Sequence, residues 1–157
     1  MSAKFLFPAA AVVAVCFLWG ELPTRGQFNS DEDAAVLATL DAEVKRFLDT
    51  VATGDVDAGL RELMTDSNLS PDSDDVRALA TKAAALETNY GMFRGLEKID
   101  SRRVATDLVV MKYLYKCERF PVVWYFTFYR SAAAGAANGQ WAIVTIRFDA
   151  ELEALAK

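Results

Sequence analysis

The fold class is decided by residues 107–131, which read DLVVMKYLYKCERFPVVWYFTFYRS. β-branched and aromatic residues dominate this stretch, and they alternate with a period of two that is typical of β-strands. The connection Glu118–Pro121 is short enough for a hairpin. The stretch therefore predicts two antiparallel strands, at 107–118 and 121–131.

The two-residue period continues on both sides of this hairpin, which predicts further strands at 95–103 and 140–149 and a small-residue loop at 132–139. Together the four strands form a curved, mainly antiparallel meander. On the second strand we expect one set of residues to face the helices: Val109, Met111, Tyr113, Tyr115 and Cys117. On the fourth strand we expect one face to carry Trp141, Ile143 and Thr145, and the other Ala142, Val144, Ile146 and Phe148.

The chain before these strands has helical spacing. Ser30 and Asp33 resemble a capping box at the start of a first helix, which ends at Gly54. Asp55 can cap a second, shorter helix, and a third begins near Asp74 and ends at Tyr90–Gly91. The first helix should bury one apolar stripe: Leu37, Leu40, Val44, Phe47, Leu48 and Val51. Its polar side should carry Asp41, Glu43, Lys45 and Arg46. The predicted fold class is α+β, with three N-terminal helices packed on a four-stranded, cone-like sheet.

The first 26 residues have a different character. Met1–Lys4 carries one basic side chain, and Phe5–Trp19 is an apolar run without charges. This pattern is typical of a secretory signal peptide, and the run is short for a helix that spans a bilayer, which needs about 20 apolar residues. We predict a signal peptide at 1–26, a single domain at 27–157, and export to the periplasm or the extracellular space. The alternative is a membrane anchor formed by an uncleaved N-terminal segment.

Composition excludes several function classes. The 157 residues include no histidine, so the chain lacks the usual general base near neutral pH, the commonest metal ligand and every Ser-His or Cys-His pair. We expect no metal and no cofactor. Removal of residues 1–26 would leave Cys117 without a disulfide partner. Residues 27–76 carry 13 acidic and 3 basic side chains, which opposes binding to nucleic acid or, after signal cleavage, to anionic membranes.

Three segments carry a family likeness: FLDTVATGD at 47–55, WYFTFYR at 124–130 and NGQWAI at 138–143. With the order of the elements, they resemble the nuclear-transport-factor-2-like superfamily of cystatin-like α+β cones, here as a small exported member. The resemblance implies a conical pocket between the sheet and the helices, and often a dimer packed sheet to sheet. It implies no single activity.

Six aromatic residues are candidates for lining such a pocket: Tyr113, Tyr115, Trp124, Phe126, Phe128 and Trp141. The alternative is that they fill a core. We expect a non-catalytic domain that binds a small apolar ligand or a protein partner, with homodimerisation through the second sheet face. The alternative function is an isomerase- or lyase-like enzyme with a tyrosine and a carboxylate in the cone, although no acid falls on an inward strand position.

Eight cations in the second half of the chain are a candidate patch for an anionic ligand or an acidic partner: Arg94, Lys98, Arg102, Arg103, Lys112, Lys116, Arg119 and Arg130. Residues 77–157 carry 12 basic and 8 acidic side chains. The alternative is that these cations are ordinary surface charges that face the acidic helical half of the same molecule.

Overall fold

The computed structural model describes residues 30–65, 67, 69–131 and 139–152. Within these residues four helices precede four strands: α1 (Ser30–Ala52), α2 (Val56–Leu63), α3 (Asp74–Ala84), α4 (Leu86–Tyr90), β1 (Phe93–Ala105), β2 (Leu108–Cys117), β3 (Val122–Ser131) and β4 (Gln140–Asp149). The predicted α+β class is confirmed. The segment predicted to be a signal peptide lies outside the described residues.

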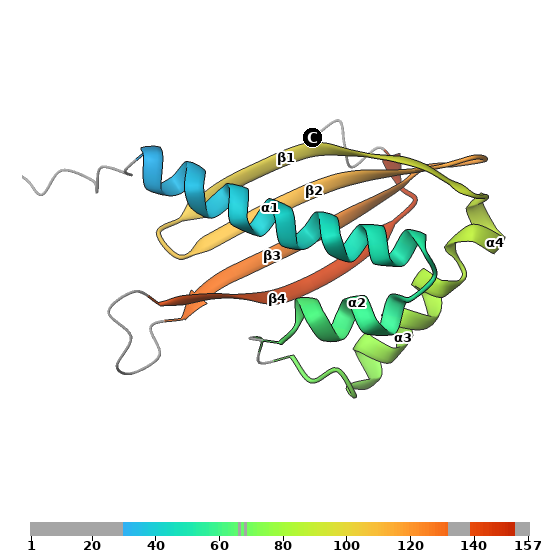
Figure 1. Cartoon of the computed structure of the whole chain (residues 1–157), viewed down its shortest axis with the longest axis horizontal. Helices are drawn as coiled ribbons and strands as arrows, with labels where there is room; N and C mark the ends of the chain where they lie inside the picture. Colours follow the sequence, from blue (N-terminus) through green and yellow to red (C-terminus); the bar gives the residue numbers. More distant parts are fainter. Residues whose placement is uncertain (1–29, 66, 68, 132–138, 153–157) are drawn as a thin grey trace, which may run out of the picture.

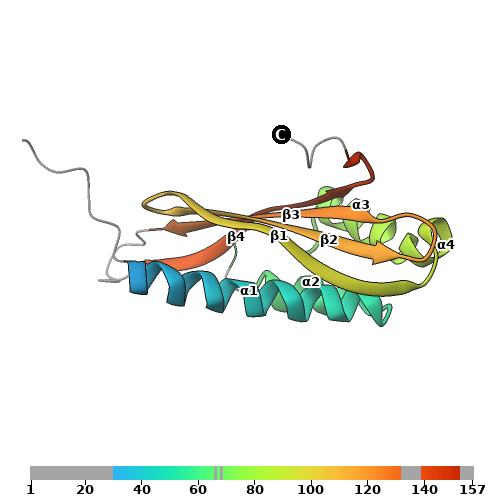
Figure 2. The ribbon, with the colours of Figure 1, turned by 90° about the horizontal axis from the view of Figure 1, so that it is seen from above.

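The strands form one antiparallel sheet in the order β1-β2-β3-β4, as the alternation predicted. The sheet is curved and does not close on itself (Figure 1). Helices α1 and α2 lie against one of its faces, and α3 and α4 lie at one end (Figure 2). Helix α1 runs obliquely across the strands, while α2 lies beside β4 (Figure 1).

The structure has four helices in its described part where three were predicted. The predicted third helix is divided at Ala85, whose φ of -86° and ψ of 0° end α3. Alanines surround this point, so helix propensity gives no sign of the break. The chain must turn here to enter β1 while Leu86 stays buried, and that requirement comes from tertiary packing.

The other predicted helix boundaries hold. Gly54 follows α1 with a φ of 87°, and Gly91 follows α4 with a φ of 92°, conformations that favour glycine. The Asp55 carboxylate accepts a hydrogen bond from the backbone of α2, as expected of an N-cap. The Asp33 carboxylate pairs with Arg103 of β1, and its predicted capping role stays a prediction.

The core lies between α1 and the two central strands. The five residues of β2 expected to face the helices are all buried. Phe47 of α1 packs edge-on against the rings of Trp124 and Phe126, at centroid distances of 5.4 and 5.9 Å. Tyr113 pairs with Trp124 and Met111 with Phe126 across β2 and β3. The centre of this layer is therefore filled by side chains.

Strand β4 departs from the predicted alternation. Its pairing shifts by one residue between Thr127 and Phe128, and Val144 is the extra residue of a β-bulge. The bulge brings four apolar residues to the helix-covered face, where they join or pack against the core: Trp141, Ile143, Ile146 and Phe148. The prediction that divided them between two faces was wrong, because a period of two does not count an inserted residue.

On the outer face of the sheet, charged side chains lie over part of the apolar surface. Lys116 pairs with Glu97 across β1 and β2, at 2.5 Å between Nζ and Oε2. The guanidinium of Arg147 lies 4.2 Å from the centroid of the Tyr125 ring. Long charged side chains cover apolar surface in this way while their ends stay in water. The predicted homodimer through this face stays a prediction.

Candidate functional site

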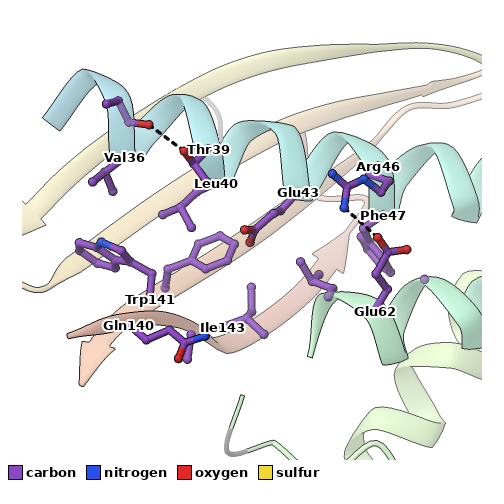
Figure 3. Close-up of a pocket in the computed structure, with 15 residues that line it drawn as sticks. Val36, Thr39, Leu40, Glu43, Arg46, Phe47, Glu62, Gln140, Trp141 and Ile143 are labelled. Atoms are coloured by element: carbon purple, nitrogen blue, oxygen red, sulfur yellow. Dashed lines mark hydrogen bonds and ion pairs between the residues drawn. The ribbon is translucent and has the colours of Figure 1, made fainter. Parts of the chain in front are cut away.

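A cavity of about 460 Å³ lies between α1, α2 and the β3–β4 edge of the sheet. Ten of its fifteen lining residues are apolar or glycine and five are polar. The larger apolar side chains come from all four elements: Val36, Leu40, Phe47, Leu63, Phe128, Trp141 and Ile143. Figure 3 shows these walls, with α1 above the cavity and β4 below it. The cavity is therefore open space beside the filled core.

Polar groups lie at the rim of this cavity. Arg46 of α1 and Glu62 of α2 form an ion pair at 2.8 Å, which bridges the two helices at one end. The carboxylate of Glu43 points from α1 toward the cavity (Figure 3). Gln140 lies at the start of β4 on the same wall as Trp141. An apolar body with few polar groups is the usual composition of a small-molecule site.

Gly59 of α2 lies where this helix packs against α1. A Cβ at Gly59 would lie 3.1 Å from Cδ2 of Phe47 and 3.2 Å from Cβ of Thr50. The missing side chain lets α2 approach α1 closely. Ala35 and Ala142 are small residues on opposite walls, so they fill little of the gap between α1 and β4.

The predicted pocket residues divide into two groups. Phe128 and Trp141 line the cavity. The other four lie on the same face of the sheet, but they pack in the buried core and do not line it: Tyr113, Tyr115, Trp124 and Phe126. Residues of α1 and α2 complete the site, and the strand alternation alone could not have found them. Their only signal in the sequence is the apolar stripe of the first helix.

One acid was placed incorrectly by the sequence. Asp41 was expected on the solvated side of the first helix, but its side chain is only 13% exposed and accepts a hydrogen bond from the Tyr113 hydroxyl. It also pairs with Lys45 at 2.8 Å and Lys98 at 3.1 Å. Asp41 follows Leu37 by four residues and so borders the apolar stripe, which was the available signal.

The pKa values of Asp41 and Tyr113 suit a structural role better than a role in proton transfer. Burial alone would raise the pKa of Asp41, but hydrogen bonds from Lys45, Tyr113 and Lys98 outweigh it and lower the pKa to about 2. Burial, reinforced by the charge of Asp41, raises the pKa of Tyr113 above its usual value. Near pH 7 the carboxylate is a weak base and the phenol a weak acid, so neither matches the pKa expected of a general acid or base.

Thiol and metal-dependent chemistry have little support in the described part of the chain. Cys117 is buried at the end of β2, and burial raises the pKa of its thiol, which disfavours the reactive thiolate. Among the described residues, acids and cysteines form no cluster that could hold a metal ion. None of the helices described here has both the length and the apolar character needed to cross a bilayer.

Comparison of the chain with protein-family models, with curated proteins and with solved structures gave no match. The resemblance to the nuclear-transport-factor-2-like superfamily therefore stays a prediction.

Proposed function

We propose that this domain is a non-catalytic binding protein that holds a small, mainly apolar ligand in the cavity between α1, α2 and β4. The observation that carries the proposal is the cavity itself. Its volume of about 460 Å³ lies within the range of roughly 300–1,000 Å³ that is common for ligand sites. Its apolar walls would gain from burying a ligand, and its rim offers polar groups that would orient one.

The wider setting is also a proposal. We propose that the curved sheet and α1 form an incomplete cone with the cavity on one side, in keeping with the conical pocket that the family resemblance implies. The chain reaches its ligand after export to the periplasm or the extracellular space, and residues 1–26 serve as the signal. Mass measurement of the protein secreted by its own host tests this, because a chain that retains residues 1–26 contradicts cleavage.

Binding is tested with the neutral fluorescent probe N-phenyl-1-naphthylamine. We expect saturable binding with one site per chain. The variant Val36→Phe fills the cavity wall and should weaken binding at least tenfold. The control Val104→Phe makes the same change at a residue that is 55% exposed on β1, away from the cavity, and should bind the probe normally. Unchanged affinity in a folded Val36→Phe variant would contradict the proposal.

The second candidate is the isomerase- or lyase-like enzyme, and one observation favours it. Asp41 and Tyr113 form the acid–tyrosine pair that such an enzyme needs, and Asp41 borders a shallow groove between α1 and β1. The low pKa of Asp41 and the raised pKa of Tyr113 oppose proton transfer, so we place this candidate second. The variant Tyr113→Phe separates the two: it should leave probe binding intact, whereas an enzyme of this kind would lose its turnover.

A further inference from the structure

The eight cations noted in the sequence do not form one patch. Five of them have acidic partners, and these pairs are dispersed over the sheet: Arg94 with Glu118, Lys98 with Asp41, Arg102 with Asp100, Arg103 with Asp33, and Lys116 with Glu97. Lys112 lies over the Tyr125 ring on the outer face, and Arg119 donates to the Thr88 carbonyl. Arg130 is the remaining cation, and it lies next to a wall of the cavity.

Arg130 lies near the end of β3, directly opposite Trp141 of β4. Its guanidinium is 5.5 Å from the centroid of the Trp141 ring, and the guanidinium of Arg103 is also 5.5 Å from it. Both arginines donate to the Thr106 carbonyl. Arg103 is paired with Asp33, whereas Arg130 has no acidic partner in the described part of the chain. Two positive charges are thus held beside one indole.

This pair of arginines meets one end of the proposed ligand site. The cavity follows α1 from Ala35 to Phe47, a distance of about 18 Å at 1.5 Å per residue. Trp141 is part of the cavity wall and at the same time the ring over which both guanidiniums lie. The apolar walls extend from there toward α2. Arg130 is not itself a lining residue, but an elongated apolar molecule that reached the Trp141 end of the cavity would end beside the indole over which the Arg130 guanidinium lies.

We propose that Arg130 anchors the carboxylate of an elongated, chain-like amphipathic anion whose apolar part occupies the cavity. This inference rests on the proposed function and names its ligand class. An arginine guanidinium binds a carboxylate through two parallel hydrogen bonds, which fix its orientation. The indole holds the Arg130 guanidinium in place before binding, so less freedom is lost when the anion arrives. Arg103 stays paired with Asp33, so its charge is largely compensated and the anchoring charge is that of Arg130.

The experiment compares three probes with the same ten-carbon chain: decanoate, decanol and decyltrimethylammonium. Their affinities are measured by displacement of N-phenyl-1-naphthylamine and by calorimetry. We expect decanoate to bind at least tenfold more tightly than decanol, and the cation to bind most weakly. Arg130→Gln should reduce decanoate binding to the level of decanol, and Arg130→Lys should retain part of the preference. The control Arg147→Gln removes a guanidinium that lies over Tyr125 on the outer face, and it should change nothing.

The outcomes separate this proposal from the one on which it rests. Equal binding of the three probes to the unaltered protein overturns the anion site and leaves the cavity proposal standing. Equal weakening of all three by Arg130→Gln also overturns the anion site, because it shows that Arg130 only supports Trp141. Failure of every probe, including the fluorescent one, overturns both proposals. If Arg130→Gln does not fold, Arg130→Lys carries the same comparison of anion with alcohol.

Discussion

The two flanks of α1 meet the same sheet in different ways. On the β1 side, Asp33 pairs with Arg103, and Asp41 contacts both Lys98 and Tyr113. On the β4 side, α1 faces a cavity of about 460 Å³. The difference teaches that this helix contacts the sheet through its centre and its β1 flank, while on the β4 side it is held by α2 through the Arg46–Glu62 ion pair. The β4 flank can then leave room for a ligand without loosening the helix.

This division has an energetic cost. Apolar side chains that border an open cavity lack some of the dispersion contacts that a filled core provides, so they stabilise the fold less. The charged flank and the filled centre offset that loss. The comparison of the two flanks can therefore be tested by changes that act on one side and not on the other.

The largest effect is expected from truncation in the filled centre. Phe126 is fully buried against the rings of Phe47, Tyr113 and Trp124, and Phe126→Ala should cost about 3–5 kcal/mol of unfolding free energy. Phe128 is also buried, but it borders the cavity and has no ring partner among the described residues, so Phe128→Ala should cost less. Urea unfolding measures both. An equal or greater loss for Phe128→Ala would contradict the distinction between filled centre and open flank.

The next effect concerns the charged flank. Asp41→Asn removes the charge that two lysines and the Tyr113 hydroxyl contact, and should cost about 1.5–3 kcal/mol at pH 7. The pKa of Asp41 falls from an ordinary 3.8 to about 2 on folding, so its ionised form stabilises the fold above about pH 4. That stabilisation is lost as the pH falls from about 4 to 2.

Urea unfolding of wild type and Asp41→Asn between pH 7 and pH 2 tests the direction of this pH dependence. The difference between wild type and Asp41→Asn should shrink toward pH 2, where about half of the Asp41 carboxylate is protonated. Asp72→Asn is the matched control, because Asp72 is exposed in the connection between α2 and α3. A difference that stays constant from pH 7 to pH 2 would show that the charge of Asp41 does not stabilise this flank.

A third change adds volume on each side. Val109 is fully buried in β2, so Val109→Phe should overpack the centre and cost about 1–3 kcal/mol. Val36→Phe places the same extra atoms beside the cavity, which has room for them, and should leave stability nearly unchanged. Thermal and urea unfolding of Val109→Phe and Val36→Phe compare the loss of stability in the filled centre with that beside the cavity. Similar destabilisation by both would mean that the cavity cannot accept added volume.

The smallest effect is expected at the contact between β4, which borders the cavity, and the connection that follows α2. The Ser67 hydroxyl donates to the Ile143 carbonyl at 2.6 Å and accepts from the Leu69 amide at 2.9 Å. Ser67→Ala should cost about 0.5–1.5 kcal/mol, the net value of a typical hydrogen bond. Ser70→Ala, at an exposed position nearby, is the control. Equal stability of both variants would mean that this contact does not hold β4.

Much of the fold was readable because it depends on local patterns. The period of two located all four strands to within two residues, and the helical spacing located α1 and its apolar stripe. The capping signal of Asp55 was read correctly for the same reason, since a cap joins residues only three apart. The candidate site was predicted less completely: two of its aromatic residues, Phe128 and Trp141, were found among six candidates.

The sequence by itself determined the order of the elements, the buried face of β2 and the chemistry that is missing without histidine. Tertiary structure alone decided the division of the third helix, the bulge at Val144, the inward position of Asp41 and the place of the cavity. The physical reason is distance along the chain. Periodicity and capping act between close neighbours, whereas Asp41 and Tyr113 are 72 residues apart and meet only when α1 settles on the completed sheet.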